Sequence, residues 1–104
     1  MIFAFDMDGT VCTSVERAEY NKAKPIQDMI DIINRLYDDS HIIKIYTARG
    51  QTTGIDQEEF TRKQLKEFGV KYHELVMGKT HFDLLIDDKC ITPSDFKILH
   101  KHLI

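Results

Sequence analysis

The stretch FAFDMDGTVC, residues 3–12, joins an apolar run to a sharp polar turn. Residues 2–5 are all apolar, which is typical of a strand buried on both faces. Two carboxylates, Asp6 and Asp8, follow directly, and the Gly-Thr pair after them favours a turn. A turn alone would account for Asp-x-Asp-Gly. The role of the two acids therefore depends on what the rest of the chain places beside them.

Apolar runs alternate with helical patterns along the rest of the chain. The runs predict strands over 42–46, 71–76 and 83–87. The first helix is expected to begin at Pro25 and to end near residues 38–40. The second helix is expected to start behind Asp56 and to stop at Gly69, and the third to open at Thr92-Pro93, with Thr92 as its cap.

This alternation predicts an α/β fold. Strands that alternate with helices favour a small parallel sheet with helices on both faces, which is a Rossmann-like three-layer sandwich. Lys44, inside the run 42–46, indicates that one face of that sheet is only partly covered. The 104 residues are enough for one core, so a single domain over 1–104 is expected.

Composition narrows the class of protein. A hydrophobic content of 42% and a charged content of 30% suit a globular chain, and a net charge of −3 gives no electrostatic footprint for nucleic acid. No apolar stretch approaches the roughly 20 residues that span a bilayer, and the N-terminus has no basic region typical of a signal peptide. We therefore expect a cytoplasmic protein without a membrane partner. Two cysteines are too few for a disulfide framework.

Carboxylates gather where the first and the fourth predicted strands end. Asp6 and Asp8 follow the first strand, and Asp87 and Asp88 end the fourth. A doubly wound sheet places its site at the carboxyl ends of its strands, so these acids are expected to lie close together. Like charges at that distance raise one another's pKa, and a hard divalent cation removes the cost. The sequence therefore predicts a Mg²⁺ site.

Phosphate-binding groups follow the other strand ends. The candidates are Gly9, Thr47, Ala48, Arg49 and Lys79, which offer backbone N–H groups, a hydroxyl and two cations. With a metal and phosphate ligands in place, Asp6 is the remaining candidate nucleophile, and Asp8 is placed to act as acid and then as base. Two residues keep a second interpretation: Arg49 would otherwise be a solvated loop residue, and Thr47 a strand-favouring residue.

These segments resemble a known family. DMDGT, the Thr of IKIYTARG, the Lys of GKT and the acidic pair of LLIDDK are similar, in order, to the four motifs of the haloacid dehalogenase (HAD) superfamily. The resemblance implies a phosphatase rather than a dehalogenase, because the acid at the position of Asp8 marks the phosphatase and phosphomutase branches. It also implies the following roles: Asp6 as nucleophile and metal ligand, Asp8 as general acid/base with its carbonyl on the metal, Thr47 and Lys79 on the phosphoryl group with Lys79 also orienting Asp6, Asp87 on the metal and Asp88 supporting it.

The resemblance also bears on the cap and the substrate. Residues 11–24 and 50–55 leave room only for a short flap and a loop, which is similar to capless members of the superfamily. An open site admits a large substrate or is covered by another subunit, which leaves room for a homo-oligomer. YTARG, TRKQLKEFGVKYHEL and GK…IDDK resemble small HAD proteins associated with capsular or surface polysaccharide synthesis, which implies a small-molecule sugar phosphate as substrate. Thr80 departs from that subgroup, where a proline is common.

Two alternatives remain open from the sequence. Capless HAD sites also serve the 3′-phosphate ends of nucleic acid, although the acidic balance of this chain disfavours such a partner. A binding or regulatory module without turnover would also use an acidic cluster and a lysine on a similar sheet. The second acid of the DxD motif argues against that module, because it is placed for hydrolysis.

Overall fold

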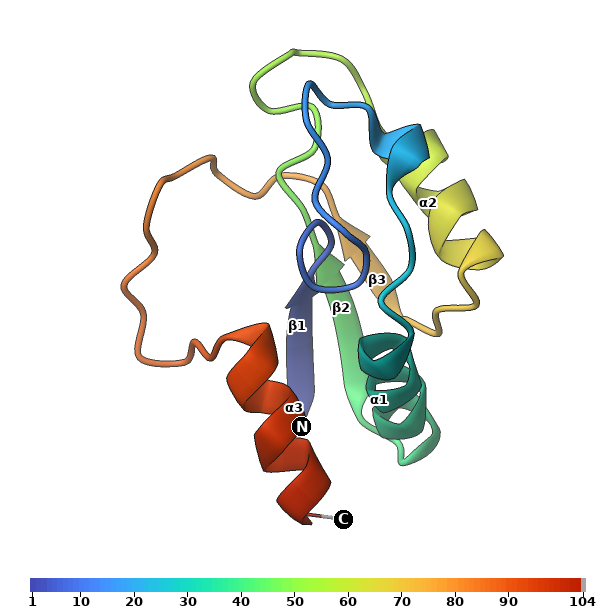
Figure 1. The fold of residues 1–104 in the computed structure, drawn as a ribbon, viewed down its shortest axis with the longest axis vertical. Coiled ribbons are helices and arrows are strands. Elements are labelled where there is room, and N and C mark those ends of the chain that lie inside the picture. Colours follow the sequence, from blue (N-terminus) through green and yellow to red (C-terminus); the bar gives the residue numbers. More distant parts are fainter. Residues whose placement is uncertain (104) are drawn as a thin grey trace.

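A three-stranded parallel sheet forms the centre of the molecule (Figure 1). The computed structural model describes residues 1–103, with side chains described for residues 1–100. The strand order is β1-β2-β3, and Phe3 and Phe5 of β1 lie opposite Ile43 and Ile45 of β2. The strands are β1 (Ile2–Asp6), β2 (Ile42–Tyr46) and β3 (Glu74–Val76).

The helices begin and end close to the positions that the sequence predicts. The helical elements are the short η1 (Tyr20–Lys22), then α1 (Gln27–Asp38), α2 (Glu58–Glu67) and α3 (Pro93–Leu103). Asp56 accepts the N–H of Glu58 at the start of α2 (2.9 Å), and Gly69 ends that helix with a φ of +72°. Thr92 caps α3 by accepting the N–H of Asp95 (3.2 Å).

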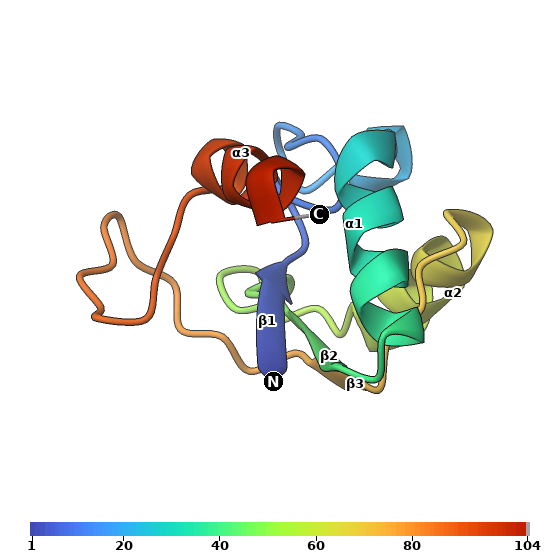
Figure 2. The same cartoon turned by 90° about the horizontal axis from the view of Figure 1, so that it is seen from below.

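All three α-helices lie on the same side of the sheet (Figure 2). The face that they cover carries the buried side chains of Phe5, Ile43 and Ile45. The opposite face leaves Ile2 62% exposed and Ile42 43% exposed. The α/β class and the small parallel sheet are therefore confirmed, whereas the described residues place no helix on the second face. The charge at position 44 was the sequence signal for this open face.

The segment 81–92 differs most from expectation. The predicted strand over 83–87 is absent from the described structure, and Leu84 and Ile86 are 76% and 86% exposed. Figure 1 shows this segment running from the end of β3 around the outside of the molecule to α3. An apolar run becomes a strand only when it pairs, and β1, the edge strand beside which it would lie, keeps its outer edge free among the described residues.

Two smaller corrections concern the first helix and the third strand. Pro25 precedes α1 instead of opening it, because the N–H of Ile26 donates to the carbonyl of Val11 (2.9 Å) and holds this stretch extended beside residues 11–13. The third strand is shorter than 71–76. The Asn34 side chain binds the carbonyl of Gly69 and the N–H of Lys71 (2.9 and 2.8 Å), which ties the preceding residues to α1.

Candidate active site

Asp6 and Lys79 form an ion pair at the carboxyl ends of the strands. The Lys79 Nζ lies 3.3 Å from the Asp6 Oδ1, and the two side chains are 16% and 40% exposed. The Nζ also lies over the rings of Tyr46 and Phe82, at 5.4 and 5.3 Å from their centroids. Burial raises the pKa of Asp6 above its ordinary value of 3.8, Lys79 opposes this rise, and Asp8 adds to it.

A tight loop after β1 presents Asp8. The Met7 carbonyl accepts the N–H groups of Val11 (2.9 Å) and Cys12 (3.2 Å), so the chain folds back within residues 7–12. Gly9 has a φ of +88°, which favours glycine at this turn. Its N–H donates to the carbonyl of Cys12 (2.7 Å), so this candidate phosphate donor is already engaged inside the loop.

The predicted phosphate ligands after β2 lie largely inside the protein. Thr47 is 1% exposed, and its hydroxyl accepts the N–H of Arg49 (3.1 Å). Ala48 between them is half-buried. The N–H of Lys79 donates to the Thr47 carbonyl (3.2 Å), which ties the two strand ends together. The structure therefore brings Thr47, Ala48 and Lys79 to the same edge of the sheet, with the Thr47 hydroxyl engaged by the backbone.

Arg49 is buried and binds Asp8 through two parallel hydrogen bonds. Its Nε donates to Asp8 Oδ2 (3.0 Å) and its Nη2 to Asp8 Oδ1 (2.8 Å), and the Arg49 side chain is 0% exposed. The Nη1 donates to the Thr61 hydroxyl (3.1 Å), and the guanidinium carbon lies 4.3 Å from the centroid of the Tyr20 ring. The solvated-loop interpretation of Arg49 is therefore wrong.

The second acidic pair lies apart from the first in this structure. Asp87 and Asp88 are exposed within the segment 81–92. Asp87 accepts the N–H of Lys89 (2.9 Å), and this hydrogen bond lowers the pKa of Asp87. In the described part of the chain, no three His, Cys, Asp or Glu side chains gather closely enough to hold a metal ion. Asp6 thus offers a carboxylate at the site, and Asp87 and Asp88 do not add to it here.

Tyr20 in η1 and Thr61 on α2 are residues of the site that carried no prediction, and the buried Cys12 lies beside the Arg49–Asp8 ion pair. Thr61 had a signal, because Thr61, Gln64 and Leu65 have the spacing of a buried helix face. Cys12 lies 3.6 Å by its Sγ from both Asp8 Oδ1 and Arg49 Nη2, and burial raises the pKa of its thiol to about 12. Tyr20 had no signal within its own segment.

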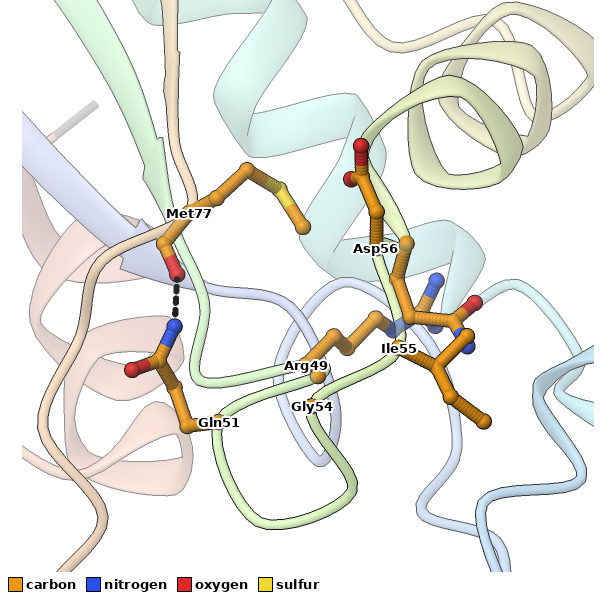
Figure 3. Close-up of a pocket in the computed structure, with 8 residues that line it drawn as sticks. Arg49, Gln51, Gly54, Ile55, Asp56 and Met77 are labelled. Atoms are coloured by element: carbon orange, nitrogen blue, oxygen red, sulfur yellow. Dashed lines mark hydrogen bonds between the residues drawn. The ribbon is translucent and has the colours of Figure 1, made fainter.

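A hollow of about 180 Å³ lies beside Arg49 (Figure 3). Its wall includes the Gln51 side chain, whose Nε2 donates to the Met77 carbonyl (3.1 Å). The lining residues are Arg49, Gly50, Gln51, Gly54, Ile55, Asp56, Gln57 and Met77. Amide and carboxylate side chains in such a wall suit a ligand that carries hydroxyl groups.

Comparisons with known proteins identify the fold. No protein-family model matches the chain, and no curated protein is significantly similar to it. The crystal structure of a protein target from Vibrio cholerae superposes with a TM-score of 0.83 at 25% identity, over 98% of this chain and 94% of that one. The D,D-heptose 1,7-bisphosphate phosphatase from B. bronchiseptica, crystallised with magnesium and phosphate, gives a TM-score of 0.57 at 16% identity.

The chain has a HAD-like Rossmann fold. The match to the phosphatase covers 98% of this chain and 63% of the phosphatase. Within residues 1–103 no cap is evident, and the segments 11–24 and 50–55 are a short flap and a loop. None of the helices within residues 1–103 has the length and apolar character needed to cross a membrane.

Proposed function

We propose that this chain is a Mg²⁺-dependent phosphomonoester hydrolase that works through a phosphorylated Asp6. The observation that carries the proposal is the Asp6–Lys79 pair, at 3.3 Å, with the Asp8 carboxylate at the same edge of the sheet. A carboxylate nucleophile, a cation beside it and a second acid two residues on are the groups that phosphoryl transfer through an aspartyl phosphate requires.

The proposed reaction has two steps. An oxygen of Asp6 attacks phosphorus, the bond to the ester oxygen breaks, and Asp8 gives that oxygen a proton. Water, deprotonated by Asp8, then attacks the phosphorus of phospho-Asp6 and releases inorganic phosphate, which returns Asp6 to its free form. Lys79 holds the Asp6 carboxylate and one phosphoryl oxygen.

Magnesium fits this site in part. Mg²⁺ in phosphate sites usually binds one or two carboxylates together with phosphate oxygens and waters. The 40% exposed Asp6 side chain supplies such a carboxylate, and the proposal adds the Asp8 carbonyl. Asp87 and Asp88 are proposed as further metal-binding residues, which requires the segment 81–92 to approach the free edge of β1. When bound, the ion would neutralise charge on the phosphoryl group.

A sugar phosphate is the proposed substrate class. The hollow beside Arg49 offers polar groups to the hydroxyl groups of a sugar, because Gln51, Asp56 and Gln57 contribute to its wall. The phosphatase with a similar fold acts on a heptose bisphosphate, as its name says. The sequence resemblance to proteins of capsular or surface polysaccharide synthesis supports the same class, in a cytoplasmic enzyme that is open to self-association.

The test is phosphate release from a panel of phosphomonoesters with and without Mg²⁺. The panel contains sugar phosphates, nucleotides and a 3′-phosphorylated oligonucleotide, and the variants are Asp6→Asn and Asp31→Asn. Asp31 is a matched control, because it is an exposed carboxylate on α1 whose partner among the described side chains is Gln27. We expect release from a sugar phosphate that needs both Mg²⁺ and Asp6, and that Asp31→Asn leaves unchanged.

Two results would replace this proposal. Preferred release from the oligonucleotide, with binding that weakens steeply as salt rises, would favour a nucleic-acid 3′-phosphatase. No release from any ester, in a folded chain that still binds Mg²⁺, would favour a phosphate-binding or regulatory module without turnover.

A further inference from the structure

The buried guanidinium of Arg49 faces Asp8 and not the open side of the site. Every polar atom of its head is engaged: Nε and Nη2 bind Asp8, and Nη1 binds Thr61. The Arg49 side chain is 0% exposed, whereas that of Asp8 is 25% exposed. A phosphoryl group would meet Asp8 before it met the guanidinium. Arg49 therefore acts on the site through Asp8.

This ion pair fixes the direction in which the Asp8 carboxylate points. Each carboxylate oxygen accepts one N–H from the planar guanidinium, and a bidentate pair of this kind allows one relative orientation. Each oxygen keeps further lone-pair capacity, and the exposed part of the side chain leaves it accessible from the site. A lysine at position 49 would keep the charge and lose the orientation.

Tyr20 closes the other side of the guanidinium. The flap brings the Tyr20 ring to 4.3 Å from the Arg49 guanidinium carbon, and the ring shields this cation from water. The flap is held there by Gln64 of α2, whose Nε2 donates to the Tyr20 carbonyl (2.8 Å). The loop after β1, the loop after β2 and the flap thus meet at one cation.

We propose that Arg49 and Tyr20 are positioning residues that hold Asp8 in line for its two proton transfers. The proposal rests on the proposed function, because it assigns Asp8 the acid and base roles given there. Tyr20 keeps the guanidinium in place, and the guanidinium keeps the carboxylate aimed at the leaving oxygen and then at water. The flap, which covers no part of the substrate in this role, sets the efficiency of proton transfer.

Two substrates separate positioning from a structural role. An alkyl sugar phosphate has a poor leaving group that needs a proton, whereas p-nitrophenyl phosphate releases a stable phenolate without one. For the aryl ester, kcat/KM reports phosphoryl transfer to Asp6, which does not need Asp8. Its kcat also includes hydrolysis of phospho-Asp6, which does need the base.

The variants are Arg49→Lys and Tyr20→Leu, with Tyr20→Phe as the conservative partner that keeps the ring. For Arg49→Lys and Tyr20→Leu we expect kcat/KM on the sugar phosphate to fall by about 10-fold to 100-fold. This loss is smaller than the full contribution of a general acid, because Asp8 is still present but less well oriented. On p-nitrophenyl phosphate, kcat should fall with a burst of nitrophenolate, while kcat/KM changes by less than about threefold. Tyr20→Phe should restore the wild-type ratio of the two kcat/KM values.

Equal losses of kcat/KM on both esters would overturn the proposal, because a general disturbance of the site does not distinguish leaving groups. If Arg49→Lys fails to fold, Tyr20→Leu decides the question, since Tyr20 is only half-buried. Failure of the proposed function has a different signature. In that case the wild type releases no phosphate, or Asp6→Asn retains activity, and both proposals fall together.

Discussion

Two regions were predicted to supply site residues, and in the structure one of them is buried whereas the other is exposed. The loop after β2 buries Thr47 and Arg49 to 1% and 3% exposure and connects them to the β1 loop, to α2 and to the flap. The segment 81–92, with the acids Asp87 and Asp88, is exposed throughout and has no regular secondary structure. Both stretches carry residue types suited to phosphate chemistry.

The difference lies in tertiary partners. The loop after β2 follows the central strand, so its polar groups contact residues that follow β1 on one side and β3 on the other. The segment 81–92 would need the outer edge of β1, which no described residue pairs with. The residue types therefore identify candidate site residues, but the pairing of a segment with the sheet determines where those residues lie.

The largest expected difference is between two isoleucines. Ile43 of β2 is 0% exposed and Ile86 of the segment 81–92 is 86% exposed. We expect Ile43→Ala to lower the free energy of unfolding by about 2–5 kcal/mol, and Ile86→Ala to change it by less than about 0.5 kcal/mol. Urea unfolding of both variants measures this. A loss for Ile86→Ala close to that of Ile43→Ala would mean that the segment packs against the sheet.

A second contrast uses glycines. Gly50 has a φ of +85°, and an added Cβ would collide with the carbonyl oxygen of Ile55. Gly50→Ala should therefore cost roughly 2–3 kcal/mol through backbone strain, which lowers the Tm by about 8–24 °C for a domain of this size. Gly78→Ala, in open space just before Lys79, is the matched control and should leave the Tm nearly unchanged. Equal Tm values for the two variants would contradict the described loop geometry.

The two acidic regions should also differ in how charge affects stability. In the folded chain the pKa of Asp6 is raised above its ordinary value of 3.8. The free energy of unfolding therefore falls as the pH rises from about 3.8 through the pKa of the folded chain. Asp6→Asn should thus raise the Tm at neutral pH and lose that advantage below about pH 3.8. The folded pKa of Asp87 is lowered, so Asp87→Asn should slightly lower the Tm at neutral pH. Thermal scans at pH 3.5 and pH 7 measure the change in Tm for each variant. A change of the same sign at pH 7 for Asp6→Asn and Asp87→Asn would contradict the opposite pKa shifts of the two acids.

The smallest effect concerns thiol chemistry. Cys12 is buried beside Asp8, with a thiol pKa raised to about 12, and Cys90 is exposed in the segment 81–92. A thiol reagent should modify one cysteine quickly in the folded chain and both after unfolding, because only the thiolate reacts. Cys90→Ser should abolish the fast reaction. Fast labelling that persists in Cys90→Ser would mean that the Cys12 pocket opens readily.

Local patterns predicted most of the fold. Residues 42–46 form a strand with the expected bounds, and the caps at Thr92 and Gly69 are where the residue types favour them. The strand over 83–87 and the burial of Ile2 were not predicted correctly. An apolar run does not encode its partner strand, and β1 is apolar on both faces although helices cover only one.

For the site, the sequence placed Asp6, Thr47 and Lys79 at one edge of the sheet, because parallel strands end at the same edge. It did not predict the direction of Arg49. The partners of Arg49 lie 41 positions away at Asp8 and 12 positions away at Thr61, and no local periodicity links them. The sequence also did not predict that the N–H of Gly9 donates to the carbonyl of Cys12, because this hydrogen bond depends on the conformation of the whole loop 7–12.

The aromatic rings around Lys79 have a consequence for ionic strength. The Lys79 side chain is 16% exposed, and its ammonium lies over the rings of Tyr46 and Phe82 and beside Asp6. Dissolved ions screen exposed charges effectively, since the Debye length shrinks from about 10 Å at 0.1 M to about 3 Å at 1 M, but they screen enclosed pairs much less. The attraction between Lys79 and Asp6 should therefore be almost as strong in concentrated salt as in dilute buffer, and the same is expected of the phosphoryl contact proposed for Lys79.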